Sequence, residues 1–93
     1  MKRITQKVDG KTMVTAALLH QSNNEQLTEE DRSILGRAFY VLSDGLEAIK
    51  VEPAPGGQYN ILYKPKEGYE DAVADILQEV KVRLAIAALY GYQ

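Results

Sequence analysis

The spacing of apolar residues over the last quarter of the chain constrains the fold most strongly. Apolar side chains recur there at steps of three and four residues, which places them on one stripe of an α-helix. The stripe consists of Tyr69, Val73, Ile76, Val80 and Leu84. Polar residues such as Glu70, Asp75 and Lys81 occupy the opposite side. The pattern predicts one amphipathic C-terminal helix of about twenty residues.

This helix loses its polar face toward its end. No charged residue follows Arg83, and Ile86 and Leu89 lie off the apolar stripe. A helix that is apolar on most sides has to be buried, and a chain of 93 residues has little mass with which to cover it. We therefore expect the tail to pack against a second copy of the chain or against another protein. The predicted interface residues are Leu84, Ile86, Leu89, Tyr90 and Tyr92.

Length and composition indicate a single globular domain spanning residues 1–93. Hydrophobic residues make up 45% of the chain and charged residues 26%, which is ordinary for a folded soluble protein. The chain has no cysteine, which excludes disulfides and thiolate metal sites and favours a reducing compartment. No apolar run reaches the ~18 residues that a membrane span requires. The expected location is therefore the cytoplasm, without a membrane partner.

The N-terminal segment contains a hairpin signal. Ile4 and Val8 alternate with polar residues, and Asp9-Gly10 follows at once. Asp-Gly between alternating runs is typical of a two-residue turn, so residues 2–8 are predicted to pair with residues 11 to about 19. The second run is ambiguous, because residues 16–19 (Ala-Ala-Leu-Leu) suit a helix equally well.

The middle of the chain predicts a helix from Thr28 to Gly45. Thr28 can accept a hydrogen bond from the backbone N–H of Asp31, and acidic residues 29–31 suit the positive end of the helix dipole. The buried stripe is predicted to contain Ile34, Leu35, Ala38, Val41 and Leu42, with Phe39 at its margin. Gly45 is expected to end the helix in a left-handed conformation.

A second hairpin follows this helix. Residues 47–52 and 58–63 have strand character, and Gly56-Gly57 can close the connection between them. The complete order is β-β-α-β-β-α, an α+β fold in which an antiparallel sheet carries two helices on one face. If residues 10–20 are helical instead, the layout resembles a winged helix with a long C-terminal helix. The helix that starts at Thr28 would then be the recognition helix, and its acidic start suits DNA poorly.

Catalytic and cofactor chemistry lacks support in the sequence. The chain has one histidine, His20, with no cysteine or second histidine that could complete a transition-metal site. Nothing supplies an orienting triad or an oxyanion loop for His20. The acidic residues Asp71, Asp75 and Glu79 recur at helical spacing and are best explained as a solvated face. We predict no catalytic residue, cofactor or metal, and a chain that is not an enzyme.

Aromatic and basic residues alternate at one place, which raises the question of nucleic acid. Tyr59 and Tyr63 share a strand face next to Lys64 and Lys66, and Lys7 belongs to a basic N-terminal segment. Stacking of bases on tyrosines beside lysines is a common way to hold single strands. Nearby acidic residues interrupt the basic path, so nucleic acid is disfavoured as a partner.

The sequence therefore predicts a small non-enzymatic protein–protein interaction or regulatory module, of adaptor or inhibitor type, that acts as a homo-oligomer. The alternative is a winged-helix-like DNA-binding transcriptional regulator. Its partner would be a second copy of the chain, forming a homodimer, or another protein.

Overall fold

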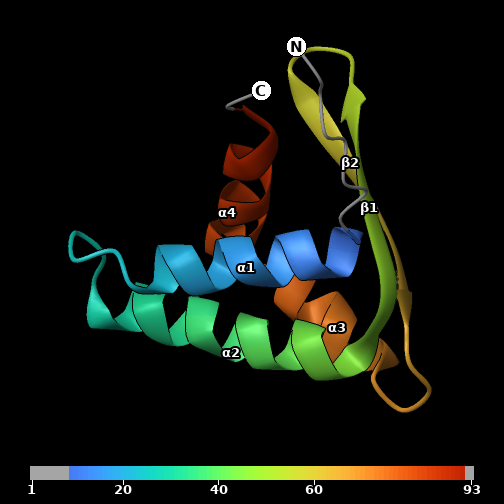
Figure 1. Cartoon of the computed structure of the whole chain (residues 1–93), viewed down its shortest axis with the longest axis horizontal. Helices are drawn as coiled ribbons and strands as arrows, with labels where there is room; N and C mark the ends of the chain where they lie inside the picture. Colours follow the sequence, from blue (N-terminus) through green and yellow to red (C-terminus); the bar gives the residue numbers. More distant parts are fainter. Residues whose placement is uncertain (1–8, 92–93) are drawn as a thin grey trace, which may run out of the picture.

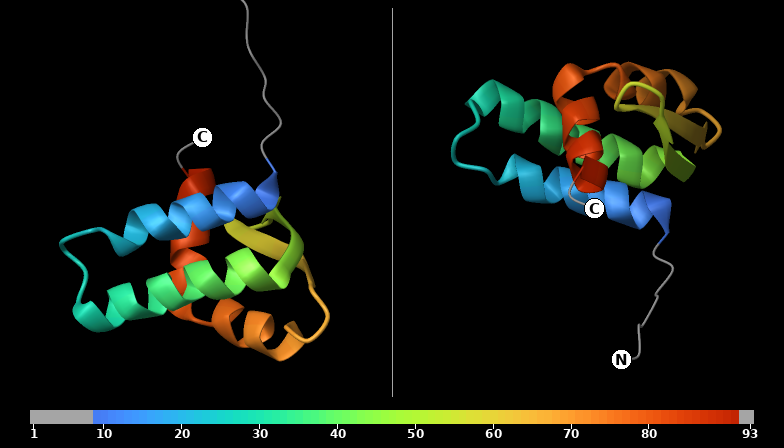
Figure 2. Two further views of the ribbon diagram at one scale, coloured as in Figure 1. Left: turned by 60° about the horizontal axis from the view of Figure 1, so that its bottom comes forward. Right: turned by 90° about the horizontal axis from the view of Figure 1, so that it is seen from above.

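A computed structural model of the chain describes residues 9–91, which form an α+β fold of four helices and a two-stranded antiparallel sheet. The elements follow in the order α1 (Gly10–Ser22), α2 (Glu29–Gly45), β1 (Leu46–Ala54), β2 (Gln58–Pro65), α3 (Glu70–Leu77) and α4 (Val80–Gly91). Figure 1 shows α1 and α2 side by side and antiparallel, with α4 standing crosswise to both. The views in Figure 2 show the same arrangement.

The prediction of an N-terminal hairpin is wrong for residues 11–19, which form most of α1. Val14 and Leu18, one helical turn apart, are both completely buried. Because α1 packs along α2 and against β1, these two side chains enter the common core. The predicted partner strand, residues 2–8, lies outside the described residues.

Helix α2 confirms the prediction for the middle of the chain. The Thr28 hydroxyl oxygen accepts a hydrogen bond from the Asp31 N–H at 3.1 Å. Leu35, Ala38 and Leu42 are buried, and the remaining members of the predicted stripe, Ile34 and Val41, are half-buried with Phe39.

The end of α2 differs from the prediction. Gly45 is the last helical residue and has no positive φ, and the chain enters β1 directly through Leu46 in an extended conformation. Position 45 requires glycine because of the close contact with Tyr69. A Cβ at this position would lie 2.6 Å from the nearest atom of the Tyr69 ring. Leu46 itself is completely buried, which anchors the start of the strand in the core.

Strands β1 and β2 form the predicted second hairpin. Their antiparallel register pairs Ile49 with Tyr63 and Val51 with Ile61. Ile49 and Val51 are buried, so this face of the hairpin covers the helices. Gly56 and Gly57 have φ values of 80° and 73°, which let the chain reverse between the strands.

The predicted single C-terminal helix is two helices in the structure. Helix α3 ends at Leu77, and α4 starts at Val80. At the break, the Gln78 N–H donates to the Asp75 carbonyl at 3.2 Å and the Glu79 N–H donates to the Ile76 carbonyl at 3.3 Å. These are bonds to the third residue back, which tighten the last turn and allow the chain to change direction.

The core takes its buried side chains from the four helices and β1, and Tyr59 and Ile61 of β2 pack against it partly buried. Its completely or almost completely buried side chains are Val14, Leu18, Leu35, Ala38, Leu42, Leu46, Ile49, Val51, Val73, Ile76, Leu77, Val82, Ala85 and Ile86. No polar or charged side chain of the described residues is buried. The core is therefore a purely apolar cluster, and α4 is attached to the fold along one side.

Candidate functional site

The break between α3 and α4 changes which side of the C-terminal segment is buried. A continuous helix would bury Val80 and Leu84 together with Val73 and Ile76. In the structure Val73 and Ile76 are buried, whereas Val80 and Leu84 are 57% and 58% exposed. The buried side of α4 instead consists of Val82, Ala85 and Ile86. Val80 and Leu84 thus form an apolar row on the outside of α4, which we call the α4 ridge.

The predicted interface residues fall into three groups. Ile86 is completely buried in the chain's own core, which corrects the expectation that a partner has to cover it. Leu84 is exposed and Leu89 is half-buried. Tyr90 belongs to α4, but its side chain lies outside the described part, as does Tyr92. The sequence pattern placed Val80 on the apolar stripe and not in the interface, because its outward position depends on the break at residues 78–79.

A groove runs along α4 on the side of the hairpin, and we call it the hairpin groove. Its volume is about 430 Å³. From α4, Val80, Leu84 and Ala87 contribute its wall, and Tyr59 and Ile61 of β2 stand opposite. Arg83 is the charged residue in this groove. The surface is therefore mostly apolar, with a cation at one edge.

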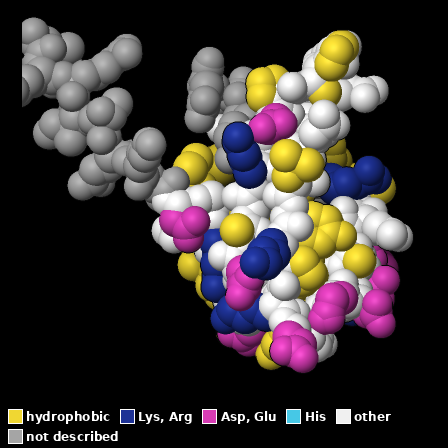
Figure 3. All heavy atoms as spheres, turned by 90° about the vertical axis from the view of Figure 1, so that its right-hand side faces the viewer, with side chains coloured by type: hydrophobic (Ala, Val, Ile, Leu, Met, Phe, Trp, Pro, Cys, Tyr) yellow, Lys and Arg dark blue, Asp and Glu magenta, His cyan; other side chains and the backbone are white. Residues whose placement is uncertain are grey.

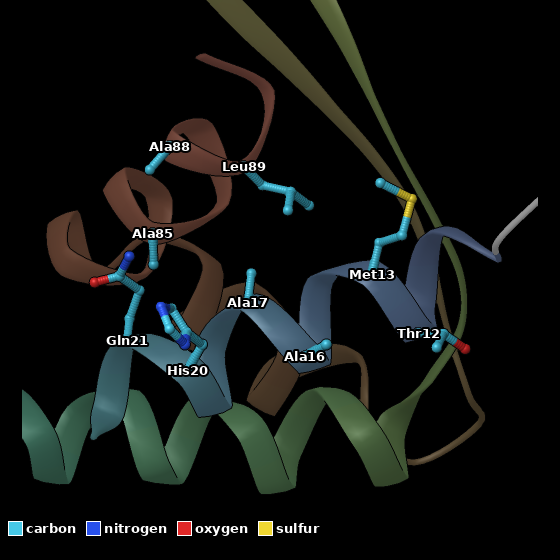
Figure 4. Close-up of a pocket in the computed structure, with 9 residues that line it drawn as sticks. All are labelled: Thr12, Met13, Ala16, Ala17, His20, Gln21, Ala85, Ala88 and Leu89. Atoms are coloured by element: carbon cyan, nitrogen blue, oxygen red, sulfur yellow. The ribbon is translucent and has the colours of Figure 1, made fainter. Parts of the chain in front are cut away.

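A second groove of about 610 Å³ separates α4 from α1, and we call it the α1 groove. In Figure 4, Met13 and Leu89 extend from α1 and α4 toward the same end of this groove, with Ala17 on its floor. His20 and Gln21 lie at the other end, near Ala85. Thr12, Ala16 and Ala88 complete the lining.

A smaller groove of about 190 Å³ lies where α4 faces the end of α1 and the start of α2, and we call it the turn groove. Leu84 and Ala88 line it from α4, and Leu27 lines it from the connection between α1 and α2. Leu84 of the α4 ridge thus has a mostly apolar hollow on either side. This arrangement suits the ridges-into-grooves packing of a further helix.

The polar groups near these grooves are few. His20 is exposed, and none of the hydrogen bonds formed by the described side chains involves its ring. No group of three or more histidine, aspartate or glutamate side chains within residues 9–91 is arranged to hold a metal ion. The arrangement offers apolar contact, and it offers no assembled set of reactive groups in the described part of the chain.

The residues considered for nucleic acid are dispersed. Tyr59 is half-buried beside α4, and Tyr63 is 40% exposed. Lys64 forms an ion pair with Glu47 at 3.2 Å, Lys66 is exposed, and Lys7 lies outside the described residues.

The hairpin and α3 present no continuous basic surface. Figure 3 shows acidic and basic side chains interspersed on this side of the molecule. Lys50 also has an acidic neighbour, because it pairs with Glu52 at 3.0 Å. Each such pair reduces the local positive potential that a phosphate backbone would require.

The structure shares with a winged helix only part of its order of elements. Helix, loop, helix and hairpin follow one another from α1 to β2, but the C-terminal helix is divided. Helices α1 and α2 lie antiparallel in Figures 1 and 2, whereas the two helices of a helix-turn-helix cross at ~90–120°. The exposed side of α2 begins with Glu29 and Glu30. This geometry argues against α2 as a DNA recognition helix.

None of the helices within residues 9–91 combines the length and the apolar character that crossing a membrane requires. Comparisons with protein-family models, with curated proteins and with solved structures give no match to this chain.

Proposed function

We propose that this chain is a non-enzymatic protein–protein interaction module, of adaptor or inhibitor type, that acts as a homo-oligomer through α4. The observation that carries the proposal is the α4 ridge. Val80 and Leu84 expose more than half of their side chains on a helix whose other side belongs to the core. Exposed apolar groups that are contiguous and bordered by hollows are typical of protein-binding surfaces.

The size of the ridge indicates what else must take part in binding. Covering the exposed parts of Val80 and Leu84 contributes roughly 1 to 2 kcal/mol for each side chain. Association costs an estimated 4 to 15 kcal/mol, so the ridge alone gives weak binding. The grooves on either side therefore have to be filled as well, and a partner helix can enter them while covering the ridge.

The surroundings of α4 favour a protein partner over a nucleic acid or a substrate. The hairpin groove and the α1 groove are lined mainly by alanine and larger apolar side chains. Apolar lining of this kind complements an amphipathic helix. DNA binding remains the second candidate on element order alone, and the acidic start of α2 weighs against it.

Sedimentation of the purified chain tests this proposal. At tens of micromolar we expect wild-type chain to sediment as a dimer, and Leu84→Asp to sediment as a folded monomer. A charge at this position would have to be desolvated in the interface, which costs several kcal/mol. Circular dichroism of the variant should match that of the wild type, because Leu84 lies outside the core.

Leu62→Asp is the matched control. Leu62 is a leucine of similar exposure, 52%, on the outer face of the hairpin. This variant should remain dimeric. A wild-type chain that stays monomeric at this concentration, or a Leu62→Asp variant that dissociates as completely as Leu84→Asp, would contradict the proposal.

A further inference from the structure

The outer side of α4 is asymmetric along its length. Val80, Leu84 and Ala88 follow one another at steps of four residues and so form one row on the helix. The first two positions of this row carry large side chains and the third carries a methyl group. Ala87 is also small and borders the hairpin groove beside Leu84. The row is thus bulky toward the start of the helix and narrow toward its end.

From this asymmetry we infer that two chains pair through α4 in antiparallel orientation, with Leu84 of both chains at the two-fold axis. The inference rests on the proposed function. Antiparallel pairing about Leu84 places Val80 of each chain opposite Ala88 of the other, so a large side chain meets a small one at both ends. Parallel pairing would place Val80 against Val80 and would leave a gap between two alanines. A two-fold arrangement uses the same surface on both chains, as closed dimers do.

The position of Lys81 on α4 suits the same orientation. Lys81 and Arg83 both lie near the start of the helix, and no charged residue follows Arg83. In the antiparallel pair Lys81 lies opposite Ala87 of the other chain, beside the C-terminal half of that helix, where the helix dipole is negative. Arg83 is exposed, so its guanidinium can remain in solvent beside the axis. Lys81 keeps its contact with Asp31, at 3.7 Å within the same chain.

The grooves provide the space for such a pair. Leu84 borders both the hairpin groove and the turn groove, and Ala88 lines the turn groove with it. Leu84, at the middle of the row, therefore has a hollow on either side. These hollows leave space beside Leu84 for the side chains of the partner helix.

Cysteine cross-linking of the full-length chain tests the orientation, because the wild-type chain has no cysteine. Under mild oxidation Leu84→Cys should form a disulfide-linked dimer. Val80→Cys alone and Ala88→Cys alone should not, whereas a mixture of these two variants should cross-link with each other. Leu62→Cys is the control for random collision. Leu84→Cys, and the mixture of Val80→Cys with Ala88→Cys, should cross-link roughly tenfold faster or more than this control. The interface raises the effective concentration of one thiol at the other.

The outcomes separate this inference from the proposed function. Self-linking of Val80→Cys and Ala88→Cys would show parallel pairing and overturn the inference. A wild-type dimer in which Leu84→Cys links no faster than Leu62→Cys would overturn it while leaving the homodimer in place. A monomeric wild-type chain in sedimentation would overturn the proposed function, and the inference with it.

Mixing two charged variants gives a second measurement that does not depend on oxidation. Leu84→Asp and Leu84→Lys should each be monomeric, because like charges would meet at the axis. An equimolar mixture should form a heterodimer in which the two charges pair. A mixture that remains monomeric as fully as the separate variants would show that the two positions do not face each other.

Discussion

Gly10, the first residue of α1, lies directly against the backbone carbonyl group of Ile49 in β1. A Cβ atom at position 10 would overlap the carbonyl oxygen, which belongs to the backbone and cannot rotate away. Gly10 does not have a positive φ, so its conformation alone does not require glycine. The requirement is space, because α1 begins where the strand passes closest to it.

Gly10→Ala is therefore expected to destabilise the fold. Either α1 or β1 has to shift to accommodate the methyl group, and overpacking of this kind typically costs about 1 to 3 kcal/mol. The urea midpoint should fall without a change in the slope of the transition, and the loss should be the same at every protein concentration tested.

Gly36→Ala is the control for this substitution. Gly36 lies within α2, and an added Cβ there would meet nothing within 4 Å. Replacing glycine by alanine inside a helix should raise the free energy of unfolding by roughly 0.5 to 1 kcal/mol. If Gly10→Ala stabilised the chain to the same extent, the close approach of α1 to β1 would be disproved.

Thr28→Ala should weaken the start of α2. The variant loses the hydroxyl oxygen that accepts from the Asp31 N–H, and loss of an N-terminal cap costs about 0.5 to 2 kcal/mol. Ser33→Ala removes a hydroxyl from an exposed position farther along the same helix and should change stability by less than ~0.5 kcal/mol. Thermal unfolding of both variants provides the comparison, and equal melting temperatures would show that the cap contributes nothing.

Helix α2 and the hairpin of β1 and β2 were predictable because their signals are local. Thr28 identifies the start of the helix through a single hydrogen bond, and Gly56 and Gly57 reverse the chain within a few residues. Each feature depends on neighbours in the sequence, so a pattern of residue types is enough to find it.

Helix α1 was not predictable in the same way, because Asp9-Gly10 is compatible both with a hairpin turn and with the start of a helix. A turn needs glycine for positive φ, whereas this fold needs it for the contact with Ile49, a residue far away in the sequence. The sequence alone does not show whether glycine is required for its backbone conformation or for a close contact with a distant residue. The helix-forming residues 16–19 were the signal that favoured the correct alternative.

The break between α3 and α4 also has no local signal. Neither glycine nor proline occurs between Ile76 and Val80, and the turn is made by two short-range hydrogen bonds. The break arises because Leu77 and Val82 both enter the core. Their separation by five residues cannot be accommodated on one face of a continuous helix. The candidate surface follows from this break, so the outward position of Val80 could be recognised only in three dimensions.

Alanine substitutions at Val80 and Val82 test this arrangement directly. A continuous helix predicts the larger loss of stability at Val80, whereas the structure predicts it at Val82. Val82→Ala removes two carbon atoms from a completely buried position and should cost about 2 to 3 kcal/mol, through lost burial and the cavity that remains. Val80→Ala should change the free energy of unfolding by less than ~0.5 kcal/mol, because its side chain is mostly exposed and alanine favours the helix. Urea titrations at a protein concentration low enough to keep the chain monomeric separate this effect from dimerisation. A larger loss of unfolding free energy for Val80→Ala than for Val82→Ala would show that the helix is uninterrupted and that Val80 is not on an exposed ridge.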